Sequence, residues 1–157
     1  MKENYLKIIF VIDESGSMQG TESDVVGGFN HFIEEQKKAE FGKITVSLYK
    51  FNSQWSRVVN DLPIDEIRPL TSDDYTPGGL TALYDTIGNA IVDIQNQTHY
   101  TDPAHQASMV IMVVITDGQE NASVEYDSRK VKEMIGELEQ SKNWQFIYLG
   151  PIWKILP

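Results

Sequence analysis

The chain has 157 residues, with 13 Lys and Arg against 23 Asp and Glu, a formal net charge of −10, and no cysteine. This length suits one domain with a substantial hydrophobic core, and the lack of cysteine excludes disulfide scaffolds, thiolate zinc sites and cysteine nucleophiles. Because Lys and Arg form no cluster, we expect neither nucleic acid nor an anionic membrane surface as a partner.

Strands and helices alternate along the sequence. The predicted strands are β-branched and aromatic runs that end in turn residues, and the predicted helices carry apolar residues at helical spacing. In the first half of the chain, we predict a buried strand over residues 5–12, a helix from Val25 to Ala39, a half-covered strand over residues 44–51, a hairpin strand over residues 55–62 and an irregular acidic segment over residues 63–76. In the second half, we predict a helix after Gly79 with an apolar stripe from Leu83 to Ile94, a polar connection over residues 95–107 and a strand over residues 108–116. A helix capped by Asp127 or Ser128 and a strand over residues 146–149 follow.

This order of elements predicts an α/β fold of the doubly wound, Rossmann-like class. We expect a mostly parallel sheet with one antiparallel edge strand and with helices on both faces. The strand over residues 108–116 is apolar on both faces, as a parallel sheet covered by helices requires. Gly27 and Gly28 weaken the first helix pattern. They indicate either a close approach of that helix to the neighbouring loop, or a kink or late start of the helix.

The N-terminal segment lacks the features of a secretion signal. Its apolar run is short, is interrupted by Lys7, and is followed by acidic residues rather than by a small-residue cleavage site. The longest uninterrupted apolar run, residues 109–115, has seven residues, whereas a membrane helix needs about 20. We therefore expect a soluble, cytoplasmic protein.

Polar residues follow the two most buried predicted strands. Asp13, Ser15 and Ser17 come after the first strand, Asp117 follows the strand over residues 108–116, and a third polar loop ends at Thr81. Ligands of open α/β sheets bind at the carboxyl ends of the strands. Two carboxylates and three hydroxyls are hard oxygen donors, which suit Mg²⁺, or Mn²⁺ or Ca²⁺ in its place. These five residues are therefore the predicted metal ligands.

The same residues resemble the metal-ion-dependent adhesion site of von Willebrand factor type A domains. The resemblance rests on three motifs in the expected order, which are D-x-S-x-S from Asp13 to Ser17, G-G-L-T ending at Thr81, and T-D-G around Asp117, and it spans residues 5 to about 150. It implies that Ser15 and Ser17 bind the ion directly, that Asp13 and Asp117 act through water or backbone hydrogen bonds, and that Thr81 binds directly or through water. It also implies an open coordination position for an acidic side chain of a protein partner.

The resemblance implies one domain over residues 1–150, followed by an apolar tail over residues 151–157. Domains of this family usually continue after a strand like that at residues 146–149 with a further helix, a strand and a last helix, and no such sequence follows here. We therefore claim no affinity switch based on a last helix. We expect the tail to cover the sheet edge or a helix groove, or to join two copies of the chain as a homodimer.

Three functions are compatible with these features. The first is a metal-dependent protein interaction module without enzyme activity. The alternative is a Mg²⁺-dependent phosphoryl-transfer hydrolase with Asp13 as nucleophile, although Ser15 stands where such enzymes need a second acid, and the chain has no P-loop pattern. The third is a structural domain with a vestigial site. Asp85, one helical turn after Thr81, is interpreted as a solvated helix acid rather than as a support of the site.

Overall fold

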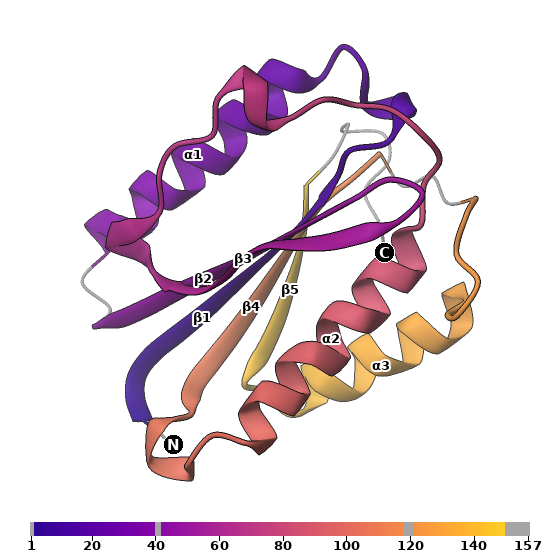
Figure 1. Ribbon diagram of the computed structural model, residues 1–157. Coiled ribbons are helices and arrows are strands. Elements are labelled where there is room, and N and C mark those ends of the chain that lie inside the picture. The colour runs from indigo at the N-terminus through magenta and orange to yellow at the C-terminus, as the bar shows by residue number, and fades with distance from the viewer. Residues whose placement is uncertain (1, 40–41, 118–120, 150–157) are drawn as a thin grey trace.

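A five-stranded sheet forms the middle layer of the computed structural model, which describes residues 2–39, 42–117 and 121–149. The strand order across the sheet is β3-β2-β1-β4-β5 (Figure 1). The elements are β1 (Lys2–Asp13), α1 (Glu22–Lys38), β2 (Lys43–Phe51), β3 (Trp55–Pro63), α2 (Leu83–His99), β4 (Ala107–Ile115), α3 (Ser128–Gln140) and β5 (Trp144–Leu149), with short 3-10 helices at η1 (Gly16–Met18), η2 (Ile64–Glu66), η3 (Ser72–Asp74) and η4 (Pro103–His105).

The pairing of the strands confirms the predicted fold class. β1 pairs in parallel with both β2 and β4, β4 pairs in parallel with β5, and only β3, at one edge of the described sheet, runs antiparallel to its neighbour. The chain goes from β1 to one side of the sheet and returns to the other, so the order of the strands reverses at β1. Ile12 is aligned with Ile115 in this register. The loops that leave β1 and β4 therefore start side by side, which is where doubly wound folds bind ligands.

Helices cover the sheet on both faces, as predicted. Figure 1 shows α1 on one face and α2 with α3 on the other. Val25, Phe29 and Ile33 recur at helical spacing on α1 and are buried against one face, where the rings of Phe10 and Phe29 lie 4.6 Å apart between centroids. The apolar stripe of α2, from Leu83 to Ile94, packs against the opposite face. Two such apolar layers hold β1 rigidly in the centre of the domain.

The strand β2 differs from the prediction of a half-covered strand, because its polar side chains are buried as well. Thr45 is 3% exposed and Ser47 is fully buried. The Thr45 hydroxyl pairs with the hydroxyl of Tyr5 at 3.1 Å, and the Ser47 hydroxyl accepts a hydrogen bond from the backbone N–H of Asp61 at 2.9 Å. The alternation of apolar and polar residues thus reflects small hydrogen-bonded side chains inside the fold rather than a face open to water.

For Gly27 and Gly28, the predictions of a close approach to the neighbouring loop and of a late helix start are wrong, and a kink of the helix stays a prediction. The helix α1 begins at Glu22 and continues through both glycines. Both residues are exposed, and no atom of the described residues lies within 4 Å of a Cβ added at either position.

The predicted tail, residues 151–157, lies outside the described residues. Within the described ranges, no helix is both long enough and apolar enough to cross a membrane.

Candidate functional site

The first candidate residue, Asp13, is the last residue of β1 and is fully buried. Its two carboxylate oxygens accept hydrogen bonds from different parts of the chain. Oδ1 accepts from the backbone N–H of Ser15 at 2.8 Å, and Oδ2 accepts from the hydroxyl of Thr116 at 2.8 Å. Because Thr116 follows β4, this pair of bonds fixes the carboxylate at the junction of the two central strands.

The electrostatic surroundings of Asp13 favour a positive charge or a proton nearby. Burial raises the pKa of the Asp13 carboxyl, the hydrogen bonds from Ser15 and Thr116 oppose that rise, and the neighbouring charge of Asp117 adds to it. Asp117 itself is 6% exposed. Two carboxylates that share a buried environment repel each other when both are ionised. A divalent cation would remove this repulsion, so the pair fits a metal site.

The two serines supply hydroxyls beside this carboxylate. The side-chain oxygens of Ser15 and Ser17 lie 3.0 Å apart, and Ser15 is fully buried whereas Ser17 is exposed. The short helix η1 begins at Gly16, between the two serines, and this turn brings hydroxyls two residues apart to the same side. One hydroxyl therefore lies inside the site and the other at its opening to solvent.

The loop that carries Thr81 is joined to the Asp13 loop through backbone hydrogen bonds. The N–H of Gly16 donates to the carbonyl of Gly79 at 3.0 Å, and the N–H of Gly78 donates to the carbonyl of Glu14 at 2.9 Å. A Cβ added at Gly16 would contact the Gly79 carbonyl oxygen at 3.4 Å. Thr81 itself is 2% exposed. The two loops therefore pack backbone to backbone, and Thr81 enters the same end of the sheet as Asp13.

The five predicted metal ligands are connected to one another by different kinds of interaction. Asp13, Ser15 and Ser17 form a hydrogen-bonded chain, Asp117 acts on Asp13 through its charge, and Thr81 is joined through the backbone of its neighbours. In the part of the chain that the structure describes, no three His, Cys, Asp or Glu side chains gather into a metal-binding group. The proposed ligand set therefore depends on hydroxyls as much as on carboxylates, which suits Mg²⁺.

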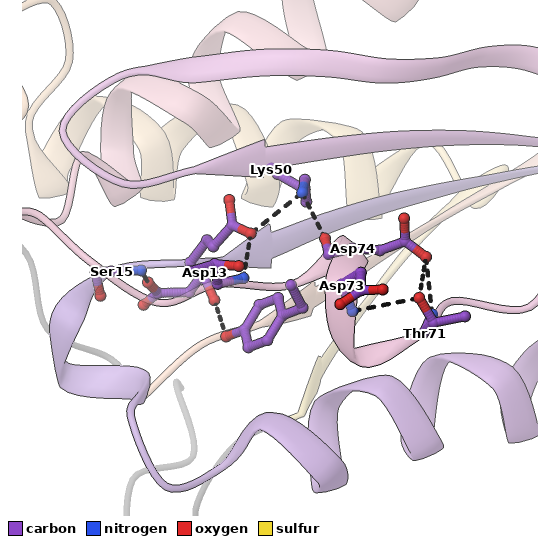
Figure 2. A network of polar contacts seen from close by, with 9 residues as sticks. Asp13, Ser15, Lys50, Thr71, Asp73 and Asp74 are labelled. Carbon is purple, nitrogen blue, oxygen red and sulfur yellow. Dashed lines mark hydrogen bonds and ion pairs between the residues drawn. The ribbon is translucent and has the colours of Figure 1, made fainter.

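A second polar network supports the Asp13 loop from the side of β2 (Figure 2). The Glu14 carboxylate accepts hydrogen bonds from Lys50 Nζ at 3.2 Å and from the backbone N–H of Thr76 at 2.9 Å, and Lys50 also donates to the carbonyl of Asp74 at 2.7 Å. The hydroxyl of Tyr75, a residue only 2% exposed, donates to the backbone carbonyl of Asp13.

Sequence reasoning missed this network. The acidic segment over residues 63–76 contains the short helices η2 and η3, and its Tyr75 belongs to the hydrophobic core. The apolar residues Ile64, Ile67 and Tyr75 within this acidic segment are the signals in the sequence that it folds back onto the sheet, and all three are buried in the core.

The prediction that Asp85 is a solvated helix acid is wrong. The residue is 6% exposed, and its carboxylate accepts hydrogen bonds from backbone N–H groups between Val124 and Tyr126. Its position on the first turn of α2 places it one turn from Thr81. The carboxylate therefore faces a loop of the protein rather than water.

The three histidines of the chain, His31, His99 and His105, lack metal-ligand spacing, and all three are exposed.

Comparisons with solved structures support the fold. The manganese-loaded TRAP protein of Plasmodium vivax matches with a TM-score of 0.62 and 16% sequence identity, over 96% of this chain and 58% of that protein. PTMP1 from the mussel byssus matches with a TM-score of 0.58 and 15% identity, over 96% of this chain and 37% of that protein. BatB from Bacteroides thetaiotaomicron matches with a TM-score of 0.55 and 16% identity, over 92% of this chain and 66% of that protein.

The chain therefore spans less than two thirds of the length of these relatives. A search of curated proteins finds no match. The model of the von Willebrand factor type A domain matches residues 7–150, which include every predicted metal ligand. The chain belongs to the von Willebrand factor type A domain family.

Proposed function

We propose that this domain is a divalent-metal-dependent protein interaction module. Domains of this family are typically protein interaction modules. In our proposal, Asp13, Ser15, Ser17, Thr81 and Asp117 hold one ion, and the ion binds an acidic side chain of a protein partner. The observation that carries the proposal is the buried carboxylate of Asp13, which is oriented by two hydrogen bonds and lies close enough to Asp117 for the two charges to interact.

The charges of the proposed ligands support the capture of an outside carboxylate. Only Asp13 and Asp117 are anionic, and the three hydroxyls are neutral. Mg²⁺ commonly keeps water in part of its coordination shell, which an anion can replace, and a bound ion dominates the local field. With the ion bound, the formal net charge changes from −10 to −8. The ion can therefore attract one carboxylate at contact range although the protein as a whole is acidic.

The surroundings of the site favour a particular kind of partner. Asp73 and Asp74 are exposed on η3, and Thr76, two residues after Asp74, donates its backbone N–H to the Glu14 carboxylate next to Asp13. Like charges at an interface are unfavourable. We therefore expect the partner to present one acidic side chain within a neutral or basic surface. Formation of a homodimer through the tail and a cytoplasmic location remain proposals of the same kind.

The burial of Asp13 supports the binding module over the hydrolase alternative. A nucleophilic carboxylate must reach the phosphorus atom of its substrate. Asp13 is fully buried, and both of its oxygens accept hydrogen bonds from the protein. This arrangement suits a carboxylate that binds an ion through water or through the residues to which it is hydrogen-bonded, rather than one that attacks a substrate.

Calorimetric titration with Mg²⁺ and with Mn²⁺ tests the proposal. We expect the wild-type protein to bind one ion, Asp13→Ala to lose that binding, and Asp65→Ala, which changes an exposed acid on η2, to bind like the wild type. A generic phosphatase substrate is assayed in parallel. Metal-dependent turnover would support the hydrolase instead, and no binding by the wild type would favour the structural domain. Capture of a protein partner that is lost on chelation would then identify the partner.

A further inference from the structure

A buried carboxylate outside the proposed ligand set organises the loop after β4. Oδ2 of Asp85 accepts a hydrogen bond from the backbone N–H of Val124 at 2.8 Å, and Oδ1 accepts from those of Glu125 and Tyr126, each at 2.8 Å. Hydrogen bonds to an ionised acceptor are stronger than those between neutral groups. Three such bonds on a residue that is only 6% exposed fix the path of the backbone from residue 124 to residue 126.

The first half of the same loop is bound to Thr81. The N–H of Thr81 donates to the side-chain oxygen of Asn121 at 2.8 Å, and the N–H groups of Asn121 and Ala122 donate to the Thr81 carbonyl at 2.9 and 3.0 Å. The N–H of Asp85 donates to the Ser123 hydroxyl at 2.9 Å. Every residue of the 121–126 segment is therefore hydrogen-bonded to Thr81 or to Asp85.

Steric contact holds the far end of the 121–126 segment. A Cβ added at Gly88, one turn after Asp85 on α2, would lie 2.6 Å from ring atoms of Tyr126, which is closer than side chains approach. The glycine thus lets the ring lie directly on the helix. Asn89 reaches the same segment, because its Nδ2 donates to Glu125 Oε1 at 3.3 Å.

We propose that Asp85 is a positioning residue of the metal site. The 121–126 segment begins four residues after Asp117, and its first two residues bind the backbone of Thr81. By holding the second half of the segment, Asp85 sets where the loop from Asp117 ends and how Thr81 is presented. The inference rests on the proposed function, since it assigns Asp85 to the support of Thr81 and Asp117 as ligands.

The variant Asp85→Asn tests this role at nearly constant shape. An asparagine offers one oxygen where the carboxylate offers two, and its NH₂ group turns a donor toward an N–H group that needs an acceptor. We expect at least tenfold faster hydrogen exchange at the amides of Val124 to Tyr126 and at the amide of Thr81. We also expect at least tenfold weaker binding of Mg²⁺ and Mn²⁺, as is typical when groups that orient metal ligands are changed.

A matched control separates positioning from general stability. Asp93 is a second hydrogen-bonded carboxylate on α2, bound by the Tyr49 hydroxyl and by Arg57 Nη1, the latter at 2.7 Å. It lies eight residues further along the helix, which is about 12 Å. We expect Asp93→Asn to lower the melting temperature without changing metal affinity or Thr81 exchange. Gly88→Ala, which displaces Tyr126 without touching the carboxylate, should weaken metal binding in the same direction as Asp85→Asn.

The outcomes distinguish the two proposals. Wild-type metal affinity in a folded Asp85→Asn protein would overturn the positioning role while leaving the metal site intact. If Asp85→Asn does not fold, wild-type metal affinity in Gly88→Ala would overturn it. Absence of metal binding by the wild type would overturn the proposed function. In that case, hydrogen exchange at the Thr81 amide tests the positioning role. Unchanged exchange at Thr81 in Asp85→Asn would overturn it.

Discussion

Thr116 donates a hydrogen bond from its hydroxyl to Oδ2 of Asp13, at 2.8 Å, between residues 103 positions apart in the chain. The bond exists because β1 and β4 are parallel neighbours whose carboxyl ends are aligned. Both residues are buried, at 2% and 0% exposure. The residue that precedes Asp117 therefore orients the carboxylate of Asp13.

Replacement of Thr116 by valine removes this donor at nearly constant volume. Because a buried carboxylate oxygen is left without a partner, we expect a loss of about 1–3 kcal/mol in the free energy of unfolding, measured by urea denaturation without metal. Thr45→Val is the matched control, since the Thr45 hydroxyl is also buried but pairs with a neutral hydroxyl, that of Tyr5. We expect a smaller loss there. Equal losses in the two variants would mean that the charge of Asp13 adds nothing to the bond.

The stability of the metal-free protein should depend on pH through Asp13. Burial raises its pKa above the usual value of 3.8, so the folded protein binds this proton more tightly than the unfolded chain does. The contribution of Asp13 to stability therefore falls as the pH rises from 3.8 through the raised pKa of the folded state.

Asp13→Asn removes this dependence. In the presence of chelator, we expect the variant to have a higher melting temperature than the wild type at pH 7, and we expect the difference to shrink as the pH is lowered toward about 4. Addition of Mg²⁺ should reverse the order at pH 7, because only the wild type gains binding energy. A difference that stays constant with pH would contradict the assignment to Asp13. Melting followed by circular dichroism measures each of these points.

Two Gly→Ala variants in helices should have opposite effects. At Gly88, the new methyl group would overlap the ring of Tyr126, and we expect a destabilisation of about 1–3 kcal/mol. At Gly27 on α1, which is exposed with nothing of the described structure within 4 Å, alanine should stabilise the protein by about 0.5–1 kcal/mol. Thermal unfolding of both variants measures the two signs. A stabilising Gly88→Ala would contradict the close packing of Tyr126 on α2.

The ion pair between Glu14 and Lys50 should matter more than a surface pair. Their side chains are 17% and 20% exposed, and Glu14 also accepts from the N–H of Thr76. We expect Glu14→Gln to cost about 1 kcal/mol and to speed hydrogen exchange at the Thr76 amide. Glu35→Gln on α1, which removes the exposed pair with Lys38, should cost less than about 0.5 kcal/mol. Similar costs would show that Glu14 does not tie the loop to β2.

The sequence alone determined the fold class and the order of the elements. Continuous β-branched runs, helical apolar stripes and turn residues are local signals, and local signals are enough to predict where the strands and helices lie. The polar motifs at Asp13 and Asp117 were placed correctly at the ends of parallel strands, because the ends of neighbouring parallel strands meet at one edge. Their role as metal ligands stays a prediction.

Only the tertiary structure decided which distant side chains support those motifs. The bond from Tyr75 to Asp13 joins residues 62 positions apart, and the bonds from Val124, Glu125 and Tyr126 to Asp85 join residues 39–41 positions apart. An acidic residue in the first turn of a helix has the same local sequence pattern whether its carboxylate faces water or accepts hydrogen bonds from a loop. The pattern around Asp85 therefore could not show which of the two applies. The outcome depends on which loops the sheet order brings together, and that order follows from the packing of the whole chain.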